Sequence, residues 1–456
     1  MLGASVAALT LAFNLAMPHR IRLIGVALLF IPQIYVPGMP VTLFALWTIY
    51  TCIFGLITRE RVRANSPLIP IMGAFLAATA SSLLWATAEG MSEGMSTVVR
   101  GALFLLWLRE IIVVAKDDPR MLDTIVMWSA PGLAVQAVLS IIFRFSAALE
   151  EQFLQSPLAR YTIGPGVERL YTDMWNNVLD VGKSGGFFIN GNMASMLGGV
   201  GALVLLITAR RTGRRSLYLC ASLSMAGSLC TGSKTAIIVT ALCAVAIAFL
   251  PHALKGWTLI LSIPVALVIP LTLSAILDVV SGIFPGLYNA SDSSIGARQI
   301  LWNSAGRLFA ESPFMGLGFG GWEEQVNRRY PPHNFIIAAW AYSGVVAAIV
   351  VVAFVVASLV VALRVAAAQS TVYHRRTAIL ALCAIAWVFL HGMADNTSVY
   401  GEQRSMFLFA LAFGYLYAMK HQSQEQAENP VRTTNGAPLP ARISDRTSLT
   451  GLRAHR

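Results

Sequence analysis

The feature that most constrains this chain is a series of thirteen long apolar runs that recur from Met1 to Met419. A bilayer has a hydrocarbon core about 30 Å thick and offers no partners for backbone polar groups, so such runs are expected to cross it as α-helices of roughly 20 residues. The sequence therefore predicts an all-α, polytopic membrane helix bundle with about 12–13 transmembrane helices. The runs lie near residues 1–17, 21–36, 40–57, 68–85, 98–115, 121–143, 192–209, 216–231, 235–250, 257–277, 335–363, 377–393 and 406–419.

The overall composition agrees with a membrane protein. Only 12% of the residues are charged, whereas soluble domains carry roughly 25%, and this excludes a soluble enzyme. The net charge of +11 could indicate nucleic acid. The basic residues, however, form short clusters between apolar runs, where they orient a chain in the lipid bilayer. We therefore expect the bilayer, and no nucleic acid, as a partner.

The short loops differ in their basic residues. Alternate loops carry fifteen Lys and Arg, whereas the loops between them carry only Lys234 and Arg404. The basic set is expected to face the cytoplasm, together with a polar, disordered tail at 420–456. The fifteen residues are Arg20, Arg22, Arg59, Arg61, Arg63, Lys116, Arg120, Arg210, Arg211, Arg214, Arg215, Lys255, Arg364, Arg375 and Arg376.

Two connections, residues 144–191 and 278–334, are much longer than turns, and the alternation places both on the outer face. Loops of this length usually carry function. With the apolar runs they are expected to form one transmembrane domain over residues 1–419. A Walker phosphate loop is missing from the sequence, which argues against an ATP-driven transporter subunit.

The second long loop is predicted to contain a helix over about residues 293–311, because a serine can cap its start and Ser-Pro can stop it. Arg298, Trp302 and Ala305 follow one face of this helix. Trp302 and Phe309 are spaced to rest an apolar side on the membrane surface. Such a helix would hold Arg298 near the lipid headgroups. Alternatively, Arg298 is an exposed, hydrated side chain on the polar face of the helix and has no further role.

Two further motifs follow in the same loop. The glycine-rich stretch Gly316–Gly321 superficially suggests a dinucleotide site, but it follows no strand, so a hinge or a close backbone approach is expected instead. Arg328, Arg329 and His333 then precede a long apolar run, and two prolines stiffen the approach. His333 is well placed to act as a base at the mouth of the membrane, or it is an ordinary loop histidine.

Several ionisable residues lie at or within apolar runs. Lys234 is a lone cation on the side poor in basic residues; it either snorkels or has a function. His391 and Asp395 are four residues apart at the exit of the twelfth run, where they could bond each other or orient a catalytic group. Arg109 and Glu110 are expected to form a structural pair. The five cysteines lie inside apolar runs without metal-ligand spacing, so we expect neither a disulfide framework nor a metal site.

Three of these segments resemble motifs of one superfamily. The string from Arg298 through Trp302, Pro313, Gly316 and Gly318 to His333-Asn334 and Gly344 resembles the signature loop of the O-antigen ligase and polymerase superfamily. TGSKTA, around Lys234, resembles the Ser-Arg-Thr/Gly-Ala element of that family. GGFFINGNMAS, residues 185–195, resembles its Gly-Phe-x-Asn-x-Asn-x-x-Ala element. The resemblance covers about residues 20–420 and is most specific over 298–344.

This resemblance implies a metal-independent, inverting glycosyltransferase of the GT-C-like type that needs no cofactor. It would transfer an undecaprenyl-diphosphate-linked glycan to an acceptor sugar hydroxyl at the periplasmic face of a bacterial inner membrane. Lys234 and Arg298 would bind the diphosphate, and His333 would be the catalytic base. Lys234 departs from the Arg common in ligases, and a Lys orients phosphate less strictly. Arg328, Arg329, Asn334, Trp302 and Asn192 are expected to contact substrate, with His391 and Asp395 behind them.

The acceptor stays open at this point. A ligase would use lipid A core, as in lipopolysaccharide, whereas a polymerase of O-antigen or exopolysaccharide would use another lipid-linked repeat unit with the same chemistry. A transporter or flippase of lipid-linked sugar is a third possibility. Because charges are scarce within the apolar runs and polar residues concentrate in the two outer loops, chemistry at the surface is favoured. A scaffold for envelope assembly would leave the placement of Lys234, Arg298 and His333 unexplained.

Overall fold

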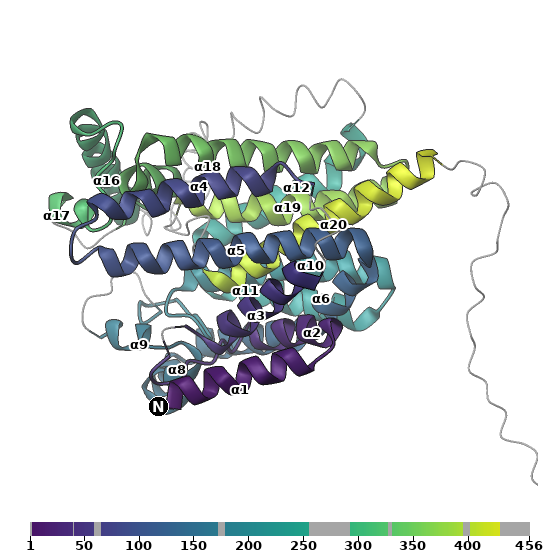
Figure 1. Ribbon diagram of the computed structural model, residues 1–456, viewed down its shortest axis with the longest axis horizontal. Coiled ribbons are helices and arrows are strands. Elements are labelled where there is room, and N and C mark those ends of the chain that lie inside the picture. Colours follow the sequence, from purple (N-terminus) through teal and green to yellow (C-terminus); the bar gives the residue numbers. More distant parts are fainter. Residues whose placement is uncertain are drawn as a thin grey trace, which may run out of the picture.

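The computed structural model describes residues 2–39, 41–58, 65–171, 178–254, 292–326, 331–394 and 402–428. Within these ranges the regular structure is helical and no strand is present. The long helices pack side by side as a bundle (Figure 1). Six helices are long and apolar enough to cross a membrane, which confirms the predicted polytopic helical membrane protein. They are Leu68–Trp85, Pro119–Phe145, Gly191–Thr212, Lys234–Ala253, Phe335–Ala368 and Val372–Ala394.

Helices coincide with twelve of the thirteen predicted runs, and the run at 257–277 lies outside the described residues. The helix at the second run has only 11 residues. It extends about 16 Å at 1.5 Å per residue and is too short to cross the bilayer alone. The helices are α1 (Leu2–Ala16), α2 (His19–Leu29), α3 (Leu43–Thr58), α4 (Leu68–Ser81) with the 3₁₀ turn η1 (Ser82–Trp85), α5 (Met91–Asp117), α6 (Pro119–Phe145), α10 (Gly191–Thr212), α11 (Arg215–Cys230), α12 (Lys234–Ala253), α18 (Phe335–Ala368), α19 (Val372–Ala394) and α20 (Gln403–Glu428).

The two ends of the bundle differ. The first long connection contains α7 (Ala147–Gln155), α8 (Pro157–Thr162) and α9 (Gly166–Arg169), and the second contains α16 (Asp292–Glu311) and α17 (Gly321–Val326). These helices lie at the end where the chain starts, and α20 points away from it (Figure 1). We call this end, with α7–α9, α16 and α17, the loop end. The described helices of both long connections thus lie on one side of the bundle, the side that the sequence predicts to face the periplasm.

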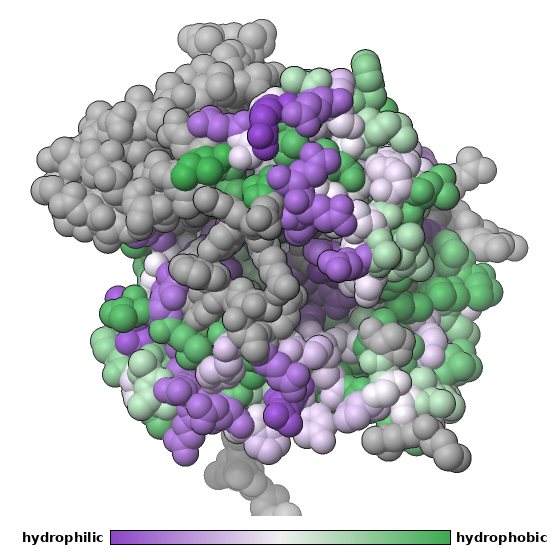
Figure 2. All heavy atoms as spheres, turned by 90° about the vertical axis from the view of Figure 1, so that its left-hand side faces the viewer, coloured by the Kyte–Doolittle hydropathy of each residue, from purple (hydrophilic) through white to green (hydrophobic). Residues whose placement is uncertain are grey.

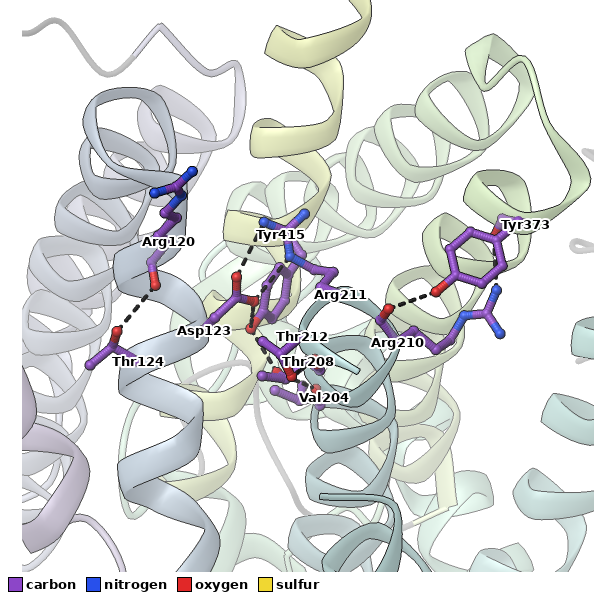
Figure 3. A network of polar contacts seen from close by, with 10 residues as sticks. All are labelled: Arg120, Asp123, Thr124, Val204, Thr208, Arg210, Arg211, Thr212, Tyr373 and Tyr415. Atoms are coloured by element: carbon purple, nitrogen blue, oxygen red, sulfur yellow. Dashed lines mark hydrogen bonds and ion pairs between the residues drawn. The ribbon is translucent and has the colours of Figure 1, made fainter. Parts of the chain in front are cut away.

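The opposite end, which we call the basic end, is where Arg210, Arg211 and their partners tie the helices together (Figure 3). Arg211 Nε lies 3.0 Å from Asp123 Oδ1 and joins α10 to α6. The Tyr415 hydroxyl of α20 donates to the same carboxylate at 3.1 Å. Arg210 donates to the Tyr373 carbonyl at 3.0 Å and lies over the Tyr373 ring, joining α10 to α19. The arginines that predict the sidedness of the chain therefore also stabilise the packing of its helices.

The predicted Arg109–Glu110 pair is present, with a separation of 3.7 Å between Arg109 Nη1 and Glu110 Oε2. The Glu110 side chain is fully buried, and its other oxygen lies 2.8 Å from His19 Nε2 at the start of α2. The carboxylate therefore joins α5 to α2. This contact between two helices supports a structural role for the Arg109–Glu110 pair.

The centre of the bundle is α20, whose residues from Arg404 to Met419 are all buried. The Phe407 ring stacks between Phe30 and Trp107, with centroids 4.7 and 5.0 Å away. A helix that is apolar on all sides is typical of such a central position. α20 continues nine residues beyond the predicted boundary at Met419, to Glu428, and residues 429–456 lie outside the described ranges.

The longest apolar run is interrupted, whereas the sequence predicts an unbroken helix over 335–363. Gly344 has φ 83° and ψ 175°, which separates Phe335–Ser343 from the rest of α18. The carbonyl of Phe314 occupies the space that a Cβ of Gly344 would need, and it accepts a hydrogen bond from the Val345 amide at 3.0 Å. The second long loop therefore packs into the break in α18.

Candidate functional site

The motifs that the sequence singles out mark the starts of three long helices at the loop end. The Asn190 side chain caps α10 by accepting from the amide two residues on, at 2.7 Å. Ser233 caps α12 through the amide three residues on, at 3.4 Å. Asn334 caps α18 through the amides two and three residues on, at 2.9 and 3.2 Å. Such caps satisfy helix amides that lack a partner within the helix. Asn192, Lys234 and His333 each lie within two residues of a cap.

One helix, α19, packs against all three of these helices. Gly199 of α10 has no room for a Cβ because the Trp387 indole of α19 lies against it. The Phe335 ring at the start of α18 stacks on Phe389 of α19, with centroids 6.2 Å apart. All three helices are thus arranged around α19.

The starts of α10 and α12 are direct neighbours. A Cβ built on Gly191 would lie 2.8 Å from the Thr231 carbonyl oxygen. Asn192 and Lys234 follow these two residues closely, and both are half-buried. The structure therefore brings together the two motifs of the GGFFINGNMAS and TGSKTA segments, which are about 40 residues apart in the sequence.

The helix that carries Arg298 is anchored on α18. Leu301, Ala305 and Leu308 form a buried cluster with Trp322 of α17 and Trp340 of α18. Arg298 lies one turn before Leu301, in α16 as predicted, and its side chain lies outside the described residues.

The surroundings of α16 differ on its two sides. Trp302 and Phe309 are 44% and 45% exposed, which suits the predicted contact with a membrane surface. Ala305 is 6% exposed. It faces the protein instead of sharing the exposed face of Trp302, because the bulky side chains of α17 and α18 occupy that side of α16.

The glycine-rich stretch is a tightly packed loop. Gly316, Gly318 and Gly320 all have positive φ, from 69° to 84°, a region that favours glycine. A Cβ on Gly316 would collide with the Trp340 carbonyl, and one on Gly320 with the Thr87 hydroxyl. The close backbone approach predicted from the sequence is confirmed. The loop fastens the connection between η1 and α5 to the start of α18.

His333 itself is in a strained conformation. Its φ of 48° lies in the left-handed region, which non-glycine residues adopt at a cost of about 1 kcal/mol or more. Its neighbours hold it there, because Pro332 is buried and Asn334 caps α18. The strain is typical of positions that functional geometry constrains.

The other predicted site residues are placed less completely. Arg328, Arg329 and Asp395 lie outside the described residues. His391 is fully buried near the loop end of α19. Within the described ranges, no group of three His, Cys, Asp or Glu residues could hold a metal ion.

Figure 2 looks onto the loop end and shows hydrophilic residues gathered across it, with hydrophobic residues along one edge.

A buried polar cluster behind this surface was missed by the sequence analysis. Gln136 of α6 donates through Nε2 to the Gly185 carbonyl at 2.9 Å and accepts from the Phe187 amide at 2.8 Å. Glu150 of α7, which is 2% exposed, accepts from the Gly185 amide at 2.8 Å. Burial raises the pKa of Glu150 to about 7, against the opposing effect of that hydrogen bond. An amide within an apolar run is itself a signal, and it could have identified Gln136.

Arg404 belongs to the same region. Its Nη1 donates to the Phe187 carbonyl at 3.1 Å, and its guanidinium lies 3.6 Å from the centroid of the Phe188 ring. Its Nε bonds Glu402 at 2.6 Å. Like Lys234, it is a cation on the side poor in basic residues, so the same sequence argument applies to it.

The fold is that of a polytopic membrane protein in which the three helices that begin at the motifs all pack against α19. Residues 217–352 match the family described as O-Antigen ligase. The match includes Lys234, Arg298 and His333, and it supports the resemblance to the O-antigen ligase and polymerase superfamily that the sequence motifs indicate. A comparison with curated proteins finds no match.

Proposed function

We propose that this protein transfers a glycan from undecaprenyl diphosphate to an acceptor sugar hydroxyl, with inversion and without a metal ion. The reaction would take place at the loop end, facing the periplasm of a bacterial inner membrane. The observation that carries the proposal is that the three helices whose starts carry the motifs all pack against α19, with the helix of Arg298 anchored on one of them. Lipid-linked glycans are the substrates that the family match suggests.

The position of Lys234 supports an anion site. Lys234 is the first residue of α12, where the helix dipole is positive and a cation is unfavourable by about 0.3–1 kcal/mol. A bound phosphate would reverse this, because helix starts and ammonium groups both attract anions. Asn192, at the adjoining start of α10, is then a candidate for contact with the same ligand. Arg298 would supply the second cation to the diphosphate.

The reaction needs a base for the acceptor hydroxyl and cations that stabilise negative charge on the leaving group. His333 would take the proton of the acceptor hydroxyl while the hydroxyl oxygen forms a bond to the anomeric carbon of the donor glycan. The bond from that carbon to the diphosphate breaks, and the lipid diphosphate leaves with its electron pair. Lys234 and Arg298 would stabilise the charge that develops on it. Attack opposite the leaving group inverts the anomeric centre.

The remaining predicted residues would shape the site. We expect Arg328, Arg329, Asn334 and Trp302 to contact the glycan or the lipid headgroup. The Asn334 oxygen also caps α18, so its substitution would affect the position of His333 as well. His391 and Asp395 are proposed to support these groups from α19 and the connection after it.

A ligase and a polymerase would differ only in the acceptor. The test uses the purified protein in lipid nanodiscs with an undecaprenyl-diphosphate-linked oligosaccharide. Lipid A core and a second lipid-linked oligosaccharide are offered separately, and the product and its anomeric configuration are analysed. Transfer to lipid A core supports the ligase, and transfer only to the second oligosaccharide supports the polymerase. Movement of the donor across liposomes without any transfer would instead indicate a flippase.

Donor binding tests the phosphate site directly. Lys234→Ala should weaken binding of the lipid-diphosphate donor, while Arg160→Ala is the matched control, because Arg160 is an exposed cation of α8 at the same end. Donor binding by Lys234→Ala at the affinity of the wild type would contradict the proposed site.

A further inference from the structure

The segment from Gly182 to Gly191 lies against the turn that precedes Lys234. The Ser184 amide donates to the Thr231 carbonyl at 3.2 Å, and the buried Ser184 hydroxyl lies 3.2 Å from the Cys230 carbonyl. A Cβ on Gly232 of the same turn would collide with the Gly182 carbonyl, and a Cβ on Gly191 would lie too close to the Thr231 carbonyl. The position of this turn, and of the start of α12 after it, therefore depends on the segment.

Two buried side chains hold the segment in turn. Gln136 forms hydrogen bonds to the backbone of Gly185 and Phe187, as a neighbouring strand would. Glu150 accepts from the Gly185 amide. Gln136 and Glu150 are 3% and 2% exposed, so bulk water cannot replace these bonds. Gly186, with φ 62°, brings the backbone close enough for Gln136 to reach both partners.

We propose that Gln136 and Glu150 are positioning residues for the donor-binding cation Lys234. Their hydrogen bonds fix Gly185, the adjacent Ser184 fixes Thr231, and the Ser233 cap then begins α12 at Lys234. This inference rests on the proposed function, in which Lys234 binds the donor diphosphate. Buried polar groups are costly unless satisfied, and apolar residues could fill the same volume. The use of polar Gln136 and Glu150 here is explained by the need to hold the irregular backbone of the Gly182–Gly191 segment in one place.

The experiment compares donor affinity with thermal stability in a set of single-residue variants. Gln136→Met keeps the volume of the side chain and removes both hydrogen bonds to the segment, together with the one to the Ser140 hydroxyl. We expect about a tenfold weaker affinity for the lipid-diphosphate donor, the effect of misplacing one charged hydrogen bond. Tyr415→Phe is the matched control: it removes buried hydrogen bonds at the basic end. It should lower the melting temperature without changing donor affinity.

The conservative variant Glu150→Gln keeps an oxygen that can accept from the Gly185 amide, so it should retain the donor affinity of the wild type, whereas Glu150→Leu should lose it. If Gln136→Met does not fold, the comparison of donor affinity between Glu150→Gln and Glu150→Leu tests the positioning role. Wild-type donor affinity in both Gln136→Met and Glu150→Leu would overturn the positioning role. Wild-type affinity in Lys234→Ala would instead show that the proposed phosphate site is wrong. The two failures are therefore distinguishable.

Discussion

His333→Gly separates the backbone strain at this residue from its proposed chemistry. A left-handed conformation costs a non-glycine residue roughly 1–2 kcal/mol, and glycine adopts it freely. Glycine also loses about 0.5–1 kcal/mol more than other residues through backbone entropy on folding. From the φ of 48°, we expect His333→Gly to change the free energy of unfolding by about 0 to +1 kcal/mol, which is neutral to stabilising. Loss of a general base should lower the transfer rate about 10²–10⁴-fold.

The assay measures single-turnover transfer from the lipid-diphosphate donor, together with donor affinity and melting temperature. His333→Gly and His333→Ala should both lose transfer and keep donor affinity, and only the glycine variant relieves the strain. His374→Ala is the matched control, because His374 is an exposed histidine at the start of α19, far along the bundle from the site. Transfer by His333→Gly at the rate of the wild type would refute the assignment of the base. A large loss of stability would refute the argument from strain.

In thermal melts, the free energy of unfolding should fall as pH rises from about 5 to 7 and then level off: the Glu150 pKa is near 7 when folded, so the native state binds more protons than the unfolded state in this range. Glu150→Gln should flatten that slope. Gly320→Ala should lower the melting temperature, because a Cβ would collide with the Thr87 hydroxyl; an unchanged value would contradict the packed loop. Transfer should persist in EDTA, and loss that one divalent ion restores would contradict metal independence. A periplasmic reporter should be active when fused within 144–171 and inactive after Arg215; activity at Arg215 would invert the topology.

Most of the fold could be predicted because the bilayer limits the possible structures so strongly. Apolar runs in lipid must become helices, and their loops alternate between two ends. What the runs could not reveal was the interruption at Gly344, because a hydropathy pattern is blind to the carbonyl that packs there. Nor could they rank the helices by burial. The short run at 406–419 forms the buried centre of the bundle, and position in a bundle depends on neighbours that are distant in the sequence.

The candidate site could be predicted as a set of residues but not as an arrangement. The motifs around Asn192, Lys234 and His333 were visible individually, and the structure adds that each marks the start of a helix packed on α19. Gln136 and Glu150 were missed because their partners are backbone groups of another segment, which no side-chain motif records. Only a rule that treats every polar residue in an apolar run as a candidate would have found Gln136.

The Lys at position 234 can be reconciled with a phosphate site by its place in α12. An Arg orients phosphate through a planar fork of donors, whereas a Lys supplies only a point charge. At the start of a helix, however, backbone amides without intrahelical partners already point along the axis toward an anion. Ser233 bonds the amide of Ala236, and the first turn of α12 can supply direction where the ammonium of Lys234 supplies charge. On this argument Lys234→Arg should keep substantial transfer activity, whereas Arg298→Lys, at a position inside α16 and not at its start, should lose more. Equal losses in the two variants would show that the helix start contributes nothing to donor orientation.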